Sequence, residues 1–106
     1  MPINSKDKGK RFELEIAHYM QKQGYENARR SQQFCGINGD ADVVGVDGLH
    51  IECKHNETLN IFKAMEQARR DKKDCEIPIV IHKKNRTPIL VTLDIDDFMK
   101  IWKKEI

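Results

Sequence analysis

The chain has 106 residues, of which 39% are hydrophobic and 34% are charged. This length predicts a single domain over residues 1–106, and the composition excludes a disordered or fibrous chain. The 19 Lys and Arg residues outnumber the 17 Asp and Glu residues only slightly, which leaves a net charge of +2. Net charge alone therefore does not indicate a nucleic-acid partner, and a DNA-binding surface would need basic residues gathered on one side.

The cysteines and the N-terminal residues predict a cytoplasmic protein. Cys35, Cys53 and Cys75 are odd in number and not closely paired, so a disulfide framework is not expected and a reducing compartment is favoured. The opening residues, MPINSKDKGKRFELE, are too polar for a signal peptide. No apolar run approaches the roughly 18 residues that span a bilayer, so no membrane partner is expected.

Hydrophobic periodicity and turn residues predict the order α-β-β-β-α-β-β-α. Ser5 or Asp7 is the expected cap of the first helix, and Gly24 is expected to end it. The expected bounds are a helix over about 8–22, strands over 25–30, 41–46 and 49–54, a helix over 61–72, strands over 77–82 and 89–93, and a helix from Asp94 or Asp96 to about 104. Residues 31–39 are predicted to be a loop. This order predicts an α/β fold with a central mixed sheet of about five strands flanked by helices, in which the 61–72 helix is the crossover between the two sheet halves.

The segment DADVVGVDGLHIECKH, residues 40–55, carries the strongest chemical pattern. Side chains alternate along a strand, so Glu52 and Lys54 are expected on one face and Cys53 on the other. A three-residue loop over 46–48 would place Asp42 opposite Glu52, with Gly48 in the left-handed conformation. Two carboxylates that close suit Mg²⁺. A two-residue loop would instead pair Asp42 with Cys53, and the charges could also be an ordinary strand-edge ion pair with Lys54.

Glu13 lies in the apolar stripe of the first helix. At 100° per residue, Ile16, Ala17 and Met20 lie within about 60° of Glu13, whereas Glu15 lies nearly opposite and is expected to face water. A carboxylate on a core-facing side is costly unless it is paired or bound to metal. Glu13 is therefore either a metal ligand or the partner of a lysine or arginine at the rim.

Together these residues resemble the archaeal-type Holliday-junction resolvases and their phage-borne relatives, within the PD-(D/E)XK nuclease superfamily. The resemblance covers nearly the whole chain and includes the element order. The segments that carry it are GKRFELE at 9–15, Gly24-Tyr25, Arg30-Ser31, Asp42-Val43-Val44 and Ile51-Glu52-Cys53-Lys54.

The resemblance implies a Mg²⁺-dependent endodeoxyribonuclease with a restriction-endonuclease-like fold, in which Mn²⁺ would substitute. It implies metal ligands at Glu13, Asp42 and Glu52 and at the backbone carbonyl of Cys53. Lys54 would orient the attacking water or stabilise charge on the phosphate. The relatives act as homodimers that cut two strands of branched DNA, read through phosphates and shape. The isoleucines of the late strands, together with Val80 and Val91, are candidates for such an interface.

The resemblance and the charge pattern also suggest DNA contacts. Arg30 and Ser31 match an arginine and a serine that approach the scissile phosphate, and Gln67 matches a glutamine near the catalytic lysine. Lys63 shares the face of Gln67. Lys10, Arg11 and Arg29 could neutralise phosphates, although solubilising charge is the usual role of such residues.

The chain departs from the family in two places. Ala41 stands where a proline is usual before the first aspartate, and the 31–39 loop lacks the usual glycine–serine stretch. The fold also serves restriction and repair nucleases, nickases and non-catalytic DNA-binding modules, which stay open as alternatives. A zinc site of Cys53, His55, Cys75 and His82 has no supporting spacing. No P-loop or dinucleotide motif occurs, so no nucleotide cofactor is expected.

Overall fold

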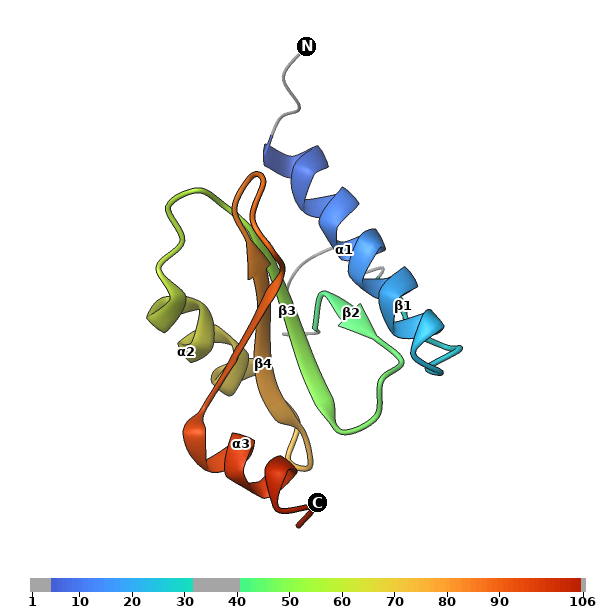
Figure 1. The fold of residues 1–106 in the computed structure, drawn as a ribbon, viewed down its shortest axis with the longest axis vertical. Helices are drawn as coiled ribbons and strands as arrows, with labels where there is room; N and C mark the ends of the chain where they lie inside the picture. The colour runs from blue at the N-terminus through green and yellow to red at the C-terminus, as the bar shows by residue number, and fades with distance from the viewer. Residues whose placement is uncertain (1–4, 32–40, 106) are drawn as a thin grey trace.

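The computed structural model describes residues 5–31 and 41–105. Within these ranges the predicted element order is confirmed (Figure 1). The elements are α1 (Ser5–Lys22), β1 (Arg29–Arg30), β2 (Val43–Val44), β3 (Leu49–His55), α2 (Ile61–Asp71), β4 (Ile77–Lys83), β5 (Leu90–Leu93) and α3 (Ile95–Trp102).

The strands form one five-stranded sheet in the order β1-β2-β3-β4-β5. β3 and β4 run parallel, and the other neighbouring pairs are antiparallel. A parallel pair needs a crossover connection, and α2 provides it between β3 and β4. The predicted α/β fold with a mixed, restriction-endonuclease-like sheet is therefore confirmed.

The two long helices cover opposite faces of this sheet (Figure 1). Ile51 and Cys53 of β3 belong to the core cluster that contains Phe12 and Ile16 of α1. Val80 of β4 belongs to a second cluster, with Met65 and other residues of α2. Because side chains alternate along parallel, in-register strands, Glu52, which is paired with Val80, lies on the α2 side of the sheet.

The β2–β3 hairpin has the register that a three-residue loop predicts. Val43 is paired with Ile51, and the backbone N–H of Leu49 donates a hydrogen bond to the carbonyl of Val46 at 3.2 Å. Gly48 adopts the expected left-handed conformation, with φ of 90°. The two-residue alternative is therefore wrong, and this register places Asp42 opposite Glu52.

Several predicted bounds were wrong near the first helix and the first two strands. α1 begins at Ser5, which is helical rather than a preceding cap, while Gly24 ends the helix region with φ of 106° as expected. β1 and β2 each span 2 residues. The segment after β2 turns at Gly45, whose φ is also 90°. The predicted 31–39 loop lies, apart from Ser31, outside the described residues.

α3 lies at the end of the molecule beside the C-terminus (Figure 1), and none of its residues is buried. Asp94 is the N-cap residue but makes no side-chain capping bond. Its carboxylate instead accepts two hydrogen bonds from the Arg69 guanidinium, at 2.9 and 2.7 Å. Asp96 and Asp97 occupy the first turn, where carboxylates favour the helix dipole.

Val80 cannot form an intermolecular interface, because it is fully buried beneath α2. Val91, by contrast, is 53% exposed.

Within the described ranges, no helix is long and apolar enough to cross a membrane.

Candidate active site

β3 directs a row of polar side chains toward α2. His50, Glu52 and Lys54 alternate with apolar residues along this strand, as the sequence predicted for Glu52 and Lys54. Glu52 is only 2% exposed. A buried carboxylate is costly unless it is hydrogen-bonded or paired, so the partners of Glu52 decide what the site can do.

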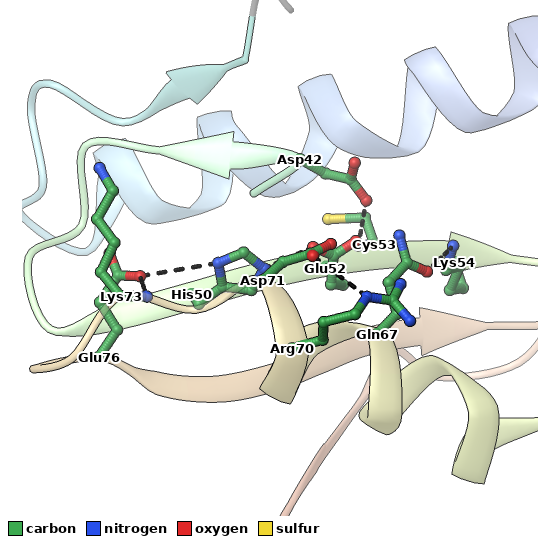
Figure 2. A network of polar contacts seen from close by, with 10 residues as sticks. All are labelled: Asp42, His50, Glu52, Cys53, Lys54, Gln67, Arg70, Asp71, Lys73 and Glu76. Carbon is green, nitrogen blue, oxygen red and sulfur yellow. Dashed lines mark hydrogen bonds and ion pairs between the residues drawn. The ribbon is translucent and has the colours of Figure 1, made fainter. Parts of the chain in front are cut away.

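Asp42 is fixed beside Glu52 by backbone and side-chain contacts. The Asp42 N–H donates to the carbonyl of Ile51 at 2.9 Å, and the Asp42 carbonyl accepts from the Ser31 N–H at 3.0 Å. The Asp42 side chain accepts a hydrogen bond at Oδ2 from the N–H of Cys53, at 2.8 Å (Figure 2). The carboxylate is therefore held against the strand that carries Glu52.

The electrostatics at Asp42 are those of crowded negative charge. Burial raises the pKa of Asp42 from 3.8 to about 7, with further contributions from the neighbouring charges of Glu52 and Glu13. The Cys53 N–H and Lys54 act in the opposite direction but do not cancel the effect. Glu52 of β3 and Glu13 of α1 therefore both lie close enough to act on the charge of Asp42, the residue that precedes β2.

Glu13 is half-buried on α1 and pairs with Arg30 of β1. Arg30 Nε donates to Glu13 Oε1 at 2.9 Å. This contact is the arginine pairing that the sequence left open as the alternative to metal ligation. Glu15 is exposed, as expected. The structure thus brings Glu13 and Arg30 to the site together.

Lys54 is held from α2 by Gln67. Lys54 Nζ donates to Gln67 Oε1 at 3.4 Å (Figure 2). The predicted proximity of Gln67 to this lysine is therefore confirmed. Lys63 lies one turn before Gln67 on the same side of α2 and is exposed.

The site suits a hard divalent cation by charge and by donor type. Carboxylate oxygens are the ligands that Mg²⁺ prefers, and a cation would relieve the repulsion that raises the pKa of Asp42. In the described part of the chain, no three His, Cys, Asp or Glu side chains are gathered as a metal cluster. Each carboxylate instead faces a donor of the protein, namely Arg30, the Cys53 N–H or His50.

His50 and Glu76 are site residues that sequence reasoning missed. His50 Nε2 lies 2.6 Å from Glu52 Oε2, and both side chains are nearly fully buried. Glu76, which precedes β4, lies on the other side of the imidazole (Figure 2). The alternation His50-x-Glu52 was a signal for the first residue, since it places both on one face of β3.

The remaining basic residues that the sequence predicted to contact DNA are exposed. Lys10 and Arg11 are exposed on α1, and Arg11 lines a separate hollow with Glu15 and His18. Arg29 is exposed and donates to the Asn27 carbonyl at 3.1 Å. Their predicted contacts with DNA stay predictions.

Cys53 belongs to the core rather than to a zinc site. It is free, buried and part of the α1-side cluster, and burial raises the pKa of its thiol. His55 packs edge-to-face on Phe12, with ring centroids 5.6 Å apart. Cys75 is exposed, so these side chains do not converge.

Comparison with known proteins places this arrangement in a family. A family model described as "Phage putative PDDEXK endonuclease" matches residues 4–106, which is nearly the whole chain and includes every element of the site. The chain belongs to this phage PD-(D/E)XK endonuclease family. No curated protein and no solved structure matches it.

Family membership identifies the chain as a PD-(D/E)XK-type nuclease with phage relatives. Nucleases of this superfamily use divalent metal ions and bind DNA. In this member of the family the signature reads A-D…E-x-K, at Ala41-Asp42 and Glu52-Cys53-Lys54.

Proposed function

We propose that this family member is a Mg²⁺-dependent endodeoxyribonuclease that cuts branched DNA as a homodimeric Holliday-junction resolvase. The observation that carries the catalytic part is the pair formed by the half-buried Asp42 and the buried Glu52, beside a lysine held by Gln67. Support for the branched substrate comes from the resemblance in residues and element order described above. Mn²⁺ is expected to replace Mg²⁺.

Asp42, Glu52 and Glu13 are the proposed metal-binding side chains, with the carbonyl of Cys53 as a fourth donor. A bound divalent cation supplies neutralisation of phosphate charge and a water of lowered pKa. Asp42 and Glu52 are pre-positioned, since both are fixed by hydrogen bonds. Glu13 would have to release Arg30 to join them.

Arg30 and Lys54 are the proposed cations of the reaction. Arg30 neutralises Glu13 in this structure, and release from Glu13 would leave its guanidinium for the scissile phosphate, with Ser31 beside it. Lys54 would stabilise the charge that develops on the phosphate, an effect that typically accounts for about 100-fold to 1,000-fold in rate. Gln67 limits the positions that the ammonium of Lys54 adopts.

Lys10, Arg11, Arg29 and Lys63 are the proposed phosphate contacts on either side of the centre. All four are exposed. Contacts of this kind position a protein on DNA without reading its sequence, and they make the affinity fall as salt rises.

The test is cleavage of a labelled four-way junction and of a matched linear duplex, each with Mg²⁺ and with chelator. Paired, Mg²⁺-dependent cuts confined to the junction are expected, and Lys54→Met should lower the rate at least about a hundredfold while junction binding persists. Cutting of both substrates would indicate another type of PD-(D/E)XK nuclease. Junction binding by folded protein without cutting, with either Mg²⁺ or Mn²⁺, would contradict the enzyme and leave a DNA-binding module.

A further inference from the structure

A buried histidine stands directly behind Glu52. The His50 and Glu52 side chains are only 3% and 2% exposed, and Nε2 lies 2.6 Å from Oε2. In the His50 tautomer that carries its proton on Nε2, the imidazole is the donor of this hydrogen bond and Glu52 Oε2 is the acceptor. This bond occupies one of the two oxygens of Glu52 and leaves Oε1 available for a cation.

The far side of the imidazole is oriented by the α2–β4 connection. Glu76 Oε1 lies 3.7 Å from His50 Nδ1, which is an ion-pair distance rather than a hydrogen bond. Glu76 is itself fixed, because Oε1 accepts a hydrogen bond from the Lys73 N–H at 2.9 Å and the Glu76 N–H donates to the Lys73 carbonyl at 3.0 Å. The chain of contacts runs from this turn through His50 to Glu52 (Figure 2).

The alternative role for His50 is that of a polar residue satisfied within the core. Burial of a histidine between two carboxylates, however, is an expensive way to fill space, since each polar group must be desolvated. Val80, the neighbour of Glu52 on the next strand, shows that this face accepts an apolar side chain. The geometry is instead that of an outer-shell partner, which orients a metal-binding side chain.

We propose that His50 is a positioning residue for Glu52, itself oriented by Glu76, and that it fixes the rotamer in which Glu52 Oε1 faces the metal centre. This inference rests on the proposed function of that centre. His50 does not itself touch the cation or the DNA. Its loss should therefore weaken metal binding and lower kcat, and leave the KM for DNA unchanged.

The test compares four proteins by calorimetric titration with Mn²⁺ alone, by thermal unfolding in chelator and by cleavage kinetics. His50→Leu removes the donor, whereas His50→Gln keeps an amide N–H in place of Nε2. Leu93→Ala is the stability control, because Leu93 is a half-buried β5 residue that packs on the α1-side core, away from Glu52. Wild type is the reference.

His50→Leu is expected to bind Mn²⁺ about 10-fold to 100-fold more weakly than wild type, which is the usual effect of removing a residue that orients a metal ligand. His50→Gln should recover most of this lost affinity. Leu93→Ala should lose stability but keep its Mn²⁺ affinity. Equal Mn²⁺ affinity in wild type and folded His50→Leu would overturn the role of His50 alone. If His50→Leu does not fold, the comparison is made with His50→Gln. A folded His50→Gln that recovers none of the expected loss in Mn²⁺ affinity would then overturn the role of His50. Failure of the wild type to bind Mn²⁺ would overturn the metal centre as well.

Discussion

Asp42 and Glu52 are held close together at the cost of electrostatic repulsion. The raised pKa of Asp42, about 7, follows from burial first and from the charges of Glu52 and Glu13 second. The ionised form of Asp42 is therefore destabilising in the absence of a cation. A binding site organised before its ligand arrives commonly has this property.

Asp42→Asn should stabilise the metal-free protein at pH 8. Asparagine keeps the acceptor for the Cys53 N–H and removes the charge. The folded pKa is about 7 and the unfolded one 3.8, so the wild type loses stability as the pH rises from about 4 through 7. We expect the free energy of unfolding to rise by on the order of 2 kcal/mol. This is less than the full pKa shift of Asp42 corresponds to, because relaxation of the protein around the charge offsets part of the penalty.

Unfolding in chelator at pH 8 and pH 4 measures this effect. The advantage of Asp42→Asn should disappear at pH 4, where Asp42 is protonated in the folded state. If Asp42→Asn is less stable than wild type at pH 8, the prediction is contradicted, and the charge of the Asp42 carboxylate is compensated by other groups of the protein. Cleavage should be lost in the variant at either outcome.

Alternation along the strand was enough to predict that Glu52 and Lys54 share a face, and residue spacing correctly indicated a special position for Glu13. The partner of Glu13 was not predictable, because Arg30 reaches it across 17 positions of sequence. Glu76 was not predictable for the same reason, because it lies far from His50 in sequence and reaches it only after α2 returns the chain to the sheet. Contacts between distant segments depend on packing that periodicity does not specify.

At the level of elements, the β2–β3 hairpin determines whether Asp42 meets Glu52. Gly45 packs so closely on the preceding turn that an added Cβ would lie 2.1 Å from the carbonyl oxygen of Asn27. Its φ of 90° also disfavours any other residue. This approach ends β2 after Val44 and packs the hairpin against the connection between α1 and β1.

Gly45→Ala should destabilise the protein by about 3 kcal/mol or more, through a backbone clash in addition to the unfavourable φ. Gly48→Ala is the matched control. It has the same φ but nothing within 4 Å of the added Cβ, so it should cost only about 1 kcal/mol. Chemical denaturation measures both. Equal losses in the two variants would contradict the importance of the Asn27 contact.

The length of the second predicted strand, 41–46, was overpredicted for the same reason. Residues 41–46 are rich in valine and read as a continuous strand, but the positive φ of Gly45 interrupts pairing. The hairpin register was predictable because Gly48 favours the left-handed position of a three-residue loop. The start of α1 was placed too late, at about residue 8 instead of Ser5, because the position of a helix end is the least sharply defined feature of a helix.

At the scale of the whole molecule, α3 presents an apolar stripe that the rest of the described chain does not cover. Ile95, Phe98, Met99 and Trp102 follow helical spacing and are 74%, 46%, 38% and 72% exposed. A helix of this length is marginal on its own in water. Leu90 of β5 is also exposed, at 56%. The proposed homodimer would cover such a surface, and the sequence had pointed to the late strands for it through Val91.

Trp102→Glu should convert the proposed dimer into a monomer. A charge at the centre of an apolar interface is strongly unfavourable, whereas Phe62→Glu, at an 80% exposed residue of α2, should leave the assembly unchanged. Sedimentation of the three proteins over a range of concentrations measures this. A monomeric wild type would contradict the dimer, and an unaffected Trp102→Glu would place the interface elsewhere.

The metal centre itself is tested most directly by anomalous diffraction from crystals grown with Mn²⁺. We expect one anomalous peak in contact with the carboxylates of Asp42 and Glu52, with Glu13 turned from Arg30 toward it, and no such peak in Glu52→Gln. A Mn²⁺ ion bound only elsewhere, in a protein whose Asp42 and Glu52 keep the contacts described above, would contradict the proposed active site.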